Sequence, residues 1–144
     1  GENQLAHNVH VKDDQLFISH YTTGIKIVDI YNPDKPVEVA AYDTYSNNDS
    51  GGFYGCWGAY PFTQNNYVYA SDMQYGLFVL EYNPIYAGWS NGYIYDEYGQ
   101  PLANLELTSL LNGKTFETDQ SGYYDFGFSE GMQDFEFSID KNFC

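Results

Sequence analysis

The feature that most constrains the fold of this chain is an internal repeat. The segment "LFISHYTTGIKIVDIYNP", residues 16–33, can be laid over "YVYASDMQYGLFVLEYNP", residues 67–84. At an offset of 52 residues the two copies agree at three anchor positions, Ser19 with Ser71, Gly24 with Gly76 and Ile27 with Val79, and the offset slips to 51 at the Asn-Pro pair that ends each copy. A period of this size is typical of proteins built from repeated supersecondary units. The sequence therefore predicts two copies of one structural unit.

Each unit has the pattern of short strands joined by tight turns. In the first copy the expected strands cover residues 8–11, 15–20, 25–30 and 37–45, and "YNPDKP" at residues 31–36 separates the last two. The prolines in that segment cannot continue a hydrogen-bonded ladder. Tyr and Phe, which favour strands, contribute to an aromatic content of 19%. Four strands in about 40 residues is the size of one propeller blade, so residues 1–83 are expected to form two such blades.

Several segments of this region resemble a known repeat family. They are "AHNVHV", "SHYTTGIKIVDI", "NPDKPVEVAAYDTY", "GCWGAYPF" and "SDMQYGLFVLEY". In this order they resemble the LVIVD-repeat β-propellers of secreted bacterial proteins, often named choice-of-anchor B proteins. The resemblance implies a secreted or cell-surface propeller and implies no particular activity. A closed propeller needs about four to eight blades, so we expect the two predicted blades to need others, from a longer protein or from other chains.

The pattern changes after residues 84–90, which we interpret as a linker. Residues 91–144 contain the landmarks "GYIYDEYGQPLANLEL" and "TDQSGYYDF". They resemble the carboxypeptidase regulatory-like domain, a small Ig- or transthyretin-like β-sandwich, and this copy is short by one or two strands. The expected fold class is all-β: two propeller-like four-stranded blades followed by a small sandwich. Modules that this second region resembles are spacers or interaction units without catalysis.

The charge of the chain excludes some partners. The formal net charge is −15, from 20 acidic residues and 5 basic ones. Such a surface repels nucleic acid phosphates and anionic lipid headgroups, and no run of about 18 apolar residues is present to span a membrane. No signal peptide is visible at Gly1, so we expect a mature form or a fragment.

All three histidines lie close together in the sequence. His7, His10 and His20, with Asp72 at the repeat position equivalent to His20, are the candidate ligands of a divalent metal, Zn²⁺ or Ca²⁺. Residues an odd number apart on a strand point to opposite faces, which separates His7 from His10. The alternative is that these polar groups hydrogen-bond the backbone near strand ends. We expect no cofactor to be required.

Other chemistry is weakly indicated. A Gly-x-Ser-x-Gly nucleophile motif and a phosphate-binding glycine loop are absent from the sequence. Cys56 and Cys144 could form one disulfide or remain two thiols. Several aromatic residues could form a glycan-stacking platform or pack internally; the candidates are Tyr45, Phe53, Tyr54, Trp57, Tyr60 and Trp89.

These observations favour a non-catalytic structural or interaction protein outside the cell or on its surface. Its expected partners are other protein chains or additional blades of the same protein, including self-assembly, with no nucleic acid and no membrane insertion. The alternative is a metal-dependent enzyme or a glycan-binding module that uses the histidines and the aromatic residues.

Overall fold

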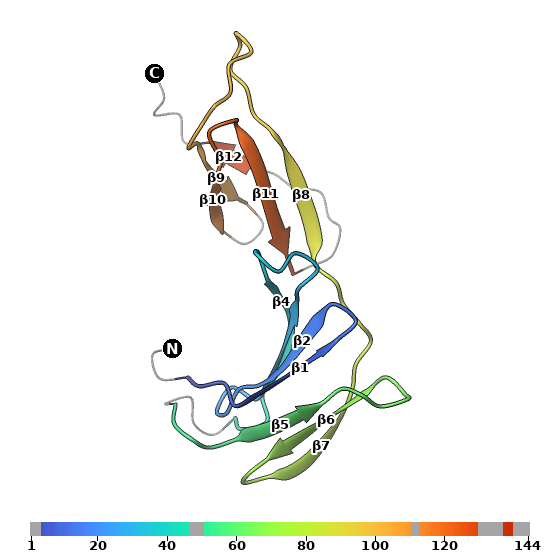
Figure 1. The fold of residues 1–144 in the computed structure, drawn as a ribbon. Coiled ribbons are helices and arrows are strands. Elements are labelled where there is room, and N and C mark those ends of the chain that lie inside the picture. Colours follow the sequence, from blue (N-terminus) through green and yellow to red (C-terminus); the bar gives the residue numbers. More distant parts are fainter. Residues whose placement is uncertain (1–3, 47–50, 111–112, 130–136, 140–144) are drawn as a thin grey trace. The chain divides into compact units, whose positions relative to one another are not determined.

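The computed structural model describes the chain except for residues 1–3, 47–50, 111–112, 130–136 and 140–144. The regular secondary structure of the described residues consists entirely of β-strands, twelve in number (Figure 1). This confirms the predicted fold class. No helix that could cross a membrane occurs in the described part of the chain.

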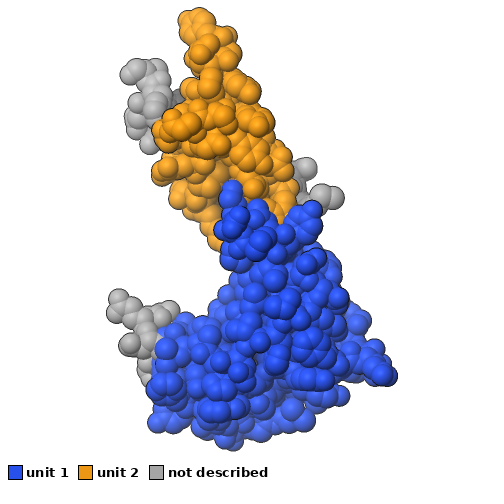
Figure 2. Space-filling view, viewed as in Figure 1, with its two compact units in different colours: residues 1–86 blue, residues 87–144 orange. Residues whose placement is uncertain are grey.

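Two compact units divide the chain (Figure 2). Unit 1 comprises Gly1–Tyr86 and unit 2 comprises Ala87–Cys144. The boundary between them falls within residues 84–90, the segment interpreted as a linker. Each unit is described below by itself.

The first sheet of unit 1 is an antiparallel meander. It contains β1 (Asn8–Lys12), β2 (Gln15–Ser19), β3 (Ile25–Asp29) and β4 (Val37–Tyr42), in the order of the chain. A bulge between Ile27 and Val28 shifts the register of β3 against β4. The four strands confirm the first predicted blade, with β4 ending three residues before the predicted end of its strand.

The second sheet of unit 1 has three strands in the described residues, where the repeat predicts four. They are β5 (Cys56–Tyr60), β6 (Tyr67–Asp72) and β7 (Gly76–Glu81), again antiparallel and in chain order. At the repeat offset, the counterpart of β4 would start at residue 89. That stretch is instead part of β8 (Gly88–Tyr93), which pairs with β11 (Tyr123–Phe128) in unit 2. The second predicted blade is therefore corrected to three strands.

The core of unit 1 lies between its two sheets. From the first sheet, Phe17, Ile25 and Ile27 are at most 5% exposed, and from the second sheet Val68 and Ala70 are at most 3% exposed. Successive strand residues point to opposite faces, so one face of each sheet supplies this core. The Phe17 and Tyr82 rings meet edge to face, with centroids 5.7 Å apart. Burial of these side chains is the main stabilising contribution that joins the two sheets.

Unit 2 contains a two-stranded and a three-stranded sheet. β8 pairs with β11, and β9 (Glu106–Ser109) lies between β10 (Thr115–Glu117) and β12 (Phe137–Ile139). Leu105, Leu107 and Ser109, which alternate with other residues in the sequence, are all buried, as one face of a strand should be. β8 begins at Gly88, three residues before the predicted start of the module, because residues 88–90 pair with residues 126–128.

Asp119 organises a turn in unit 2. The Asp119 carboxylate accepts hydrogen bonds from the backbone N–H of Ser121 and of Tyr123 and from the Ser121 hydroxyl. These bonds lower the pKa of Asp119, the Ser121 hydroxyl contributing most. Gly122 completes the turn at a φ of 74°. Asp119 therefore caps its turn.

Candidate functional site

His7 lies beside the second sheet of unit 1. Its Nδ1 is 2.6 Å from the Trp57 carbonyl oxygen, and the two rings are 3.8 Å apart between centroids. The same imidazole meets the Tyr21 ring edge to face at 5.5 Å. His7 thus packs in an aromatic cluster and uses one nitrogen on the backbone.

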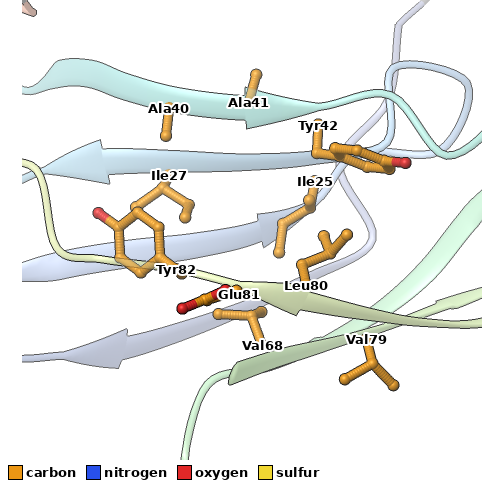
Figure 3. A pocket seen from close by; sticks show the side chains of 10 residues that line it. All are labelled: Ile25, Ile27, Ala40, Ala41, Tyr42, Val68, Val79, Leu80, Glu81 and Tyr82. Carbon is orange, nitrogen blue, oxygen red and sulfur yellow. The ribbon is translucent and has the colours of Figure 1, made fainter. Parts of the chain in front are cut away.

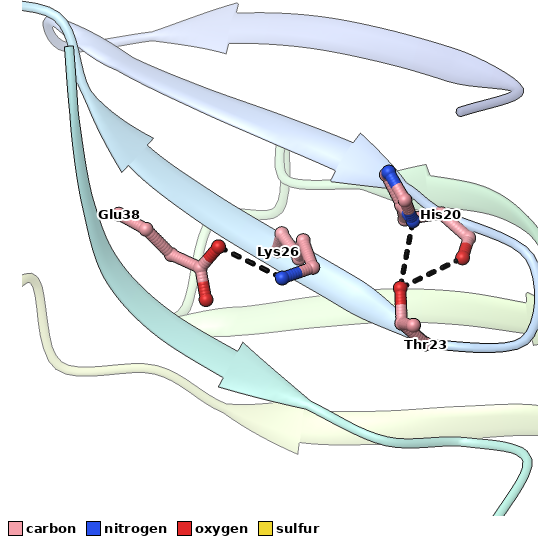
Figure 4. Close-up of polar contacts among 4 residues, drawn as sticks. All are labelled: His20, Thr23, Lys26 and Glu38. Atoms are coloured by element: carbon pink, nitrogen blue, oxygen red, sulfur yellow. Dashed lines mark hydrogen bonds and ion pairs between the residues drawn. The ribbon is translucent and has the colours of Figure 1, made fainter. Parts of the chain in front are cut away.

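His10 and His20 lie on opposite faces of the first sheet. His10 is paired with Phe17, so both face the second sheet, and its ring is 5.6 Å from that of Phe62. His20 follows β2, and its Nδ1 is 2.7 Å from the Thr23 hydroxyl oxygen (Figure 4). Burial lowers the pKa of His20 below its usual 6.5. The imidazole is therefore mainly neutral at pH 7.

Asp72 caps a turn and holds the end of the first sheet. One carboxylate oxygen accepts the backbone N–H of Gln74 and of Tyr75, and the other accepts the Thr44 hydroxyl at 2.8 Å. Thr44 follows β4, so this buried contact joins the two sheets of unit 1. Both carboxylate oxygens of Asp72 are thus occupied by protein donors.

The four candidate ligands consequently have separate surroundings. In the described part of the chain, no three His, Cys, Asp or Glu side chains are grouped as a metal ion would require. The strand alternation explains the separation of His10 from His20. The hydrogen bonds of His7 and Asp72 to the backbone agree with the alternative, in which these polar groups bond the backbone near strand ends. The His20 ring differs, because it bonds the Thr23 hydroxyl.

Cys56 is completely buried in β5 and carries a free thiol. Burial, reinforced by the nearby Asp72 carboxylate, raises the pKa of the Cys56 thiol to about 11. Cys144, the other half of the possible disulfide, lies outside the described residues. The structure therefore describes Cys56 as a packing residue and not as a nucleophile, because thiolates and not thiols react.

We expect the Cys56 thiol to be unreactive in the folded chain. In a Cys144→Ser variant, an aromatic disulfide reagent at pH 8 should label Cys56 slowly in buffer and rapidly in denaturant, because the folded thiol is both inaccessible and protonated. Absorbance of the released thiolate measures both rates. Equal rates in the two solutions would contradict the buried position and the raised pKa.

The candidate aromatic platform falls into separate groups. Tyr45 stacks on Tyr54 at 6.3 Å, and Tyr21 joins Phe53 and Trp57 by edge-to-face contacts. Tyr60 contacts Phe62 and His10 instead. Trp89 belongs to unit 2. The five residues in unit 1 thus do not form one cluster, although Phe53, Tyr54 and Trp57 are 69%, 52% and 47% exposed.

An exposed apolar surface that the sequence reasoning did not single out is the outer face of the second sheet. Its rows pair Tyr60 with Tyr69 and Val79, and Ser71 with Leu77. Leu77 is 66% exposed and Val79 is 55% exposed. The outer face is defined here as Tyr60, Tyr67, Tyr69, Ser71, Leu77 and Val79. Glu81, which pairs with Tyr67, places one carboxylate at the end of this face.

The repeat makes this exposure informative. Phe17, Ser19, Ile25 and Ile27 are equivalent at the offset of 52 to Tyr69, Ser71, Leu77 and Val79. In the first sheet all four are buried against the second sheet, and the Ser19 hydroxyl reaches the Trp57 carbonyl oxygen at 3.0 Å. The outer face therefore repeats the positions of a sheet-packing surface. Sequence alignment of the two copies could have identified it.

A second notable feature is a groove between the two sheets (Figure 3). Its volume is about 370 Å³. It is lined by Ile25, Ile27, Ala40, Ala41, Tyr42, Val68, Val79, Leu80, Glu81 and Tyr82. Leu80 points toward Ile25 across the groove, whereas Val79 points away. The groove is thus mainly apolar and opens beside the edge of β7.

Comparison with known proteins identifies one repeat. The LVIVD repeat matches residues 5–44, which contain all four strands of the first sheet. Residues 5–44 are therefore a propeller-type repeat. No curated protein and no solved structure matches the chain.

Proposed function

We propose that this chain is a non-catalytic interaction protein that packs the outer face of its second sheet against a further blade-type sheet. The observation that carries the proposal is the equivalence of Leu77 and Val79 with Ile25 and Ile27, which are buried between two sheets. The first copy of this surface packs against a sheet, so we expect the second copy, the outer face of the second sheet, to pack against a sheet as well. Stacked sheets are the arrangement of propeller blades.

The outer face of the first sheet supplies a partly matching surface, which also carries the Lys26–Glu38 ion pair. On the outer face of the first sheet, Val11 pairs with Leu16 and Leu16 with Val28, while Val9 pairs with Ile18. Val9 and Val11 are 49% and 57% exposed. Like Val68 and Ala70 on the covered face of the second sheet, these residues are apolar. The further sheet can therefore belong to a second copy of this chain or to additional blades of the same protein.

Two family assignments are part of the same proposal. We place the chain among secreted or cell-surface propellers of the choice-of-anchor B type, and unit 2 among carboxypeptidase regulatory-like sandwiches that act as spacers. The strand content of unit 2, with sheets of two and three strands, supports the second assignment. The function requires no metal or cofactor, no nucleic acid and no insertion into a membrane.

Self-association is the direct test of sheet packing. We expect the chain to exceed its monomer mass of 16.5 kDa in size-exclusion chromatography with light scattering at high concentration. Tyr69→Glu, which puts a charge at the centre of the outer face, should return it to the monomer, because burying an unpaired charge is costly. The measured quantity is the mass at each protein concentration.

Tyr31→Glu is the matched control. Tyr31 lies in the turn after β3 and is 73% exposed, so the same change of charge there should leave the mass unaltered. A wild-type chain that stays a monomer at all concentrations, alone and when mixed with separately produced LVIVD blades, would contradict the proposal.

Glycan binding is the second candidate, favoured by the exposed rings of Phe53, Tyr54 and Trp57. Stacking on a sugar should change the fluorescence of Trp57, and a Trp89→Phe variant isolates that signal. A glycan-array response lost in Trp57→Ala and kept in Tyr69→Glu would favour this function over sheet packing.

A further inference from the structure

The second sheet of unit 1 has an open edge at β7. The Tyr82 N–H donates to the Asn66 carbonyl oxygen at 2.7 Å. In antiparallel pairs the bonded residues alternate, so the backbone groups of Leu77, Val79 and Glu81 point away from β6. In the described part of the chain, no strand pairs with that side of β7.

The first sheet shows what fits this edge. The Ile30 N–H donates to the Asp14 carbonyl oxygen at 2.8 Å, and both residues lie one repeat offset before Tyr82 and Asn66. The outward-pointing residues of β3 are therefore the equivalents of those of β7, and in the first sheet they pair with β4. The free edge of β7 is therefore equivalent in the repeat to the edge of β3 that pairs with β4.

The groove lies where a fourth strand would place its side chains. Ala40 and Tyr42 of β4 line it from one side and Leu80 of β7 from the other (Figure 3). The Tyr42 and Phe78 rings are 6.0 Å apart. A strand added to β7 would direct every second side chain into this space. Its apolar lining selects apolar side chains at those positions.

The geometry favours a single strand as the occupant. β1 and β2 contact β5, and in both sheets the following strands are added in chain order. The first sheet has four strands and the second has three, so β4 extends one strand beyond the second sheet. A second copy that paired through its own β7 would bring its first sheet, including β4, into the same space. Neighbouring strands are only about 4.8 Å apart, which leaves room for one lone extended segment.

We propose that β7 binds an extended peptide segment of another polypeptide as the fourth strand of the second sheet. The segment carries apolar side chains opposite Leu80, which lines the groove, and opposite Phe78, whose ring contacts Tyr42. It carries a Lys or Arg opposite Glu81 at the groove rim. The net charge of −15 also favours a basic segment. Strand addition of this kind gains affinity from the backbone and specificity from alternate side chains. The inference deepens the proposed function, and it rests on the assignment of protein contacts to the second sheet.

The probe is a peptide built on β4 itself. It is a fluorescent copy of residues 35–44 with Val37→Lys, Glu38→Leu and Ala41→Leu, the changes that face Glu81, Leu80 and Phe78 when the β3–β4 register is transferred to β7. Fluorescence anisotropy against the full chain should show saturable binding. A peptide of the same composition in scrambled order should bind at least about fivefold more weakly, since charge alone does not specify register.

Variants at the edge provide the decisive comparison. Val79→Pro removes an N–H that points away from β6, so it spares the sheet but should weaken peptide binding at least about fivefold. Val79→Thr keeps the N–H and the branched shape and should bind within about twofold of the wild type. Glu81→Lys, at an exposed position, should weaken binding about threefold and keeps the test valid if Val79→Pro does not fold.

Each further outcome has a defined meaning. Tyr69→Glu lies on the opposite face from the groove and should leave peptide binding unchanged, so loss of self-association there and loss of strand binding in Val79→Pro are separable. Equal binding of the scrambled peptide would overturn the proposal. It would also be overturned by peptide binding that Val79→Pro and Glu81→Lys both leave intact.

Discussion

Replacing Gly24 by alanine is expected to destabilise unit 1 far more than the same change at its repeat equivalent, Gly76. Both residues have a left-handed backbone, with φ of 79° and 85°, which costs an alanine about 1–2 kcal/mol. A Cβ on Gly24 would also lie 2.1 Å from the Tyr42 carbonyl oxygen, whereas a Cβ on Gly76 would meet nothing within 4 Å. The expected losses in free energy of unfolding are about 2–5 kcal/mol for Gly24→Ala and about 1–2 kcal/mol for Gly76→Ala.

Urea denaturation followed by Trp57 fluorescence, in a Trp89→Phe background, measures this difference within unit 1. The control is built into the pair, because both variants carry the same substitution in the same kind of turn. Equal midpoints for the two variants would show that the chain leaving β4 does not crowd Gly24, and would contradict the described path of residues 42–44.

The second large effect is expected at Ile25. This side chain is 1% exposed and lies in the core between the two sheets, so Ile25→Ala should cost about 2–5 kcal/mol in free energy of unfolding through lost burial and a residual cavity. Its repeat equivalent Leu77 is 66% exposed. In the monomer, Leu77→Ala should therefore change stability by less than about 0.5 kcal/mol.

The same denaturation assay, at a protein concentration where the chain is a monomer, compares the two variants. A Leu77→Ala variant as unstable as Ile25→Ala would mean that the outer face is already covered within a single chain. At concentrations where the chain associates, Leu77→Ala should become measurably destabilising, because binding stabilises only the folded form.

Much of the fold was predictable because its signals are local. Gly24 between two alternating apolar runs marks a turn between strands, and the strands expected on either side of it are β2 and β3. In unit 2 the alternation of Leu105, Leu107 and Ser109 identified the buried face directly. Such patterns depend on the period of a strand, which is the same in every sheet.

The missing fourth strand was not predictable from the same signals. Residues 88–93 form a strand in either case, and the pattern alone does not say which partner they choose. Their pairing with residues 123–128 is a non-local contact, and it takes the strand away from β7. Prediction of the metal candidates met the same difficulty, because spacing in the sequence does not report that the oxygens of Asp72 are already bonded to Thr44, Gln74 and Tyr75.

The buried Gln15 side chain has a consequence for how unit 1 can be produced alone. Its amide nitrogen donates to the Ile85 carbonyl oxygen at 2.6 Å, and its amide oxygen accepts the Tyr82 hydroxyl at 3.1 Å. A shortened chain that stops after residue 83 would leave an amide N–H in the interior without its acceptor, at a cost of about 1–3 kcal/mol. Expression of the isolated repeat region therefore calls for a stop codon after Tyr86 or later.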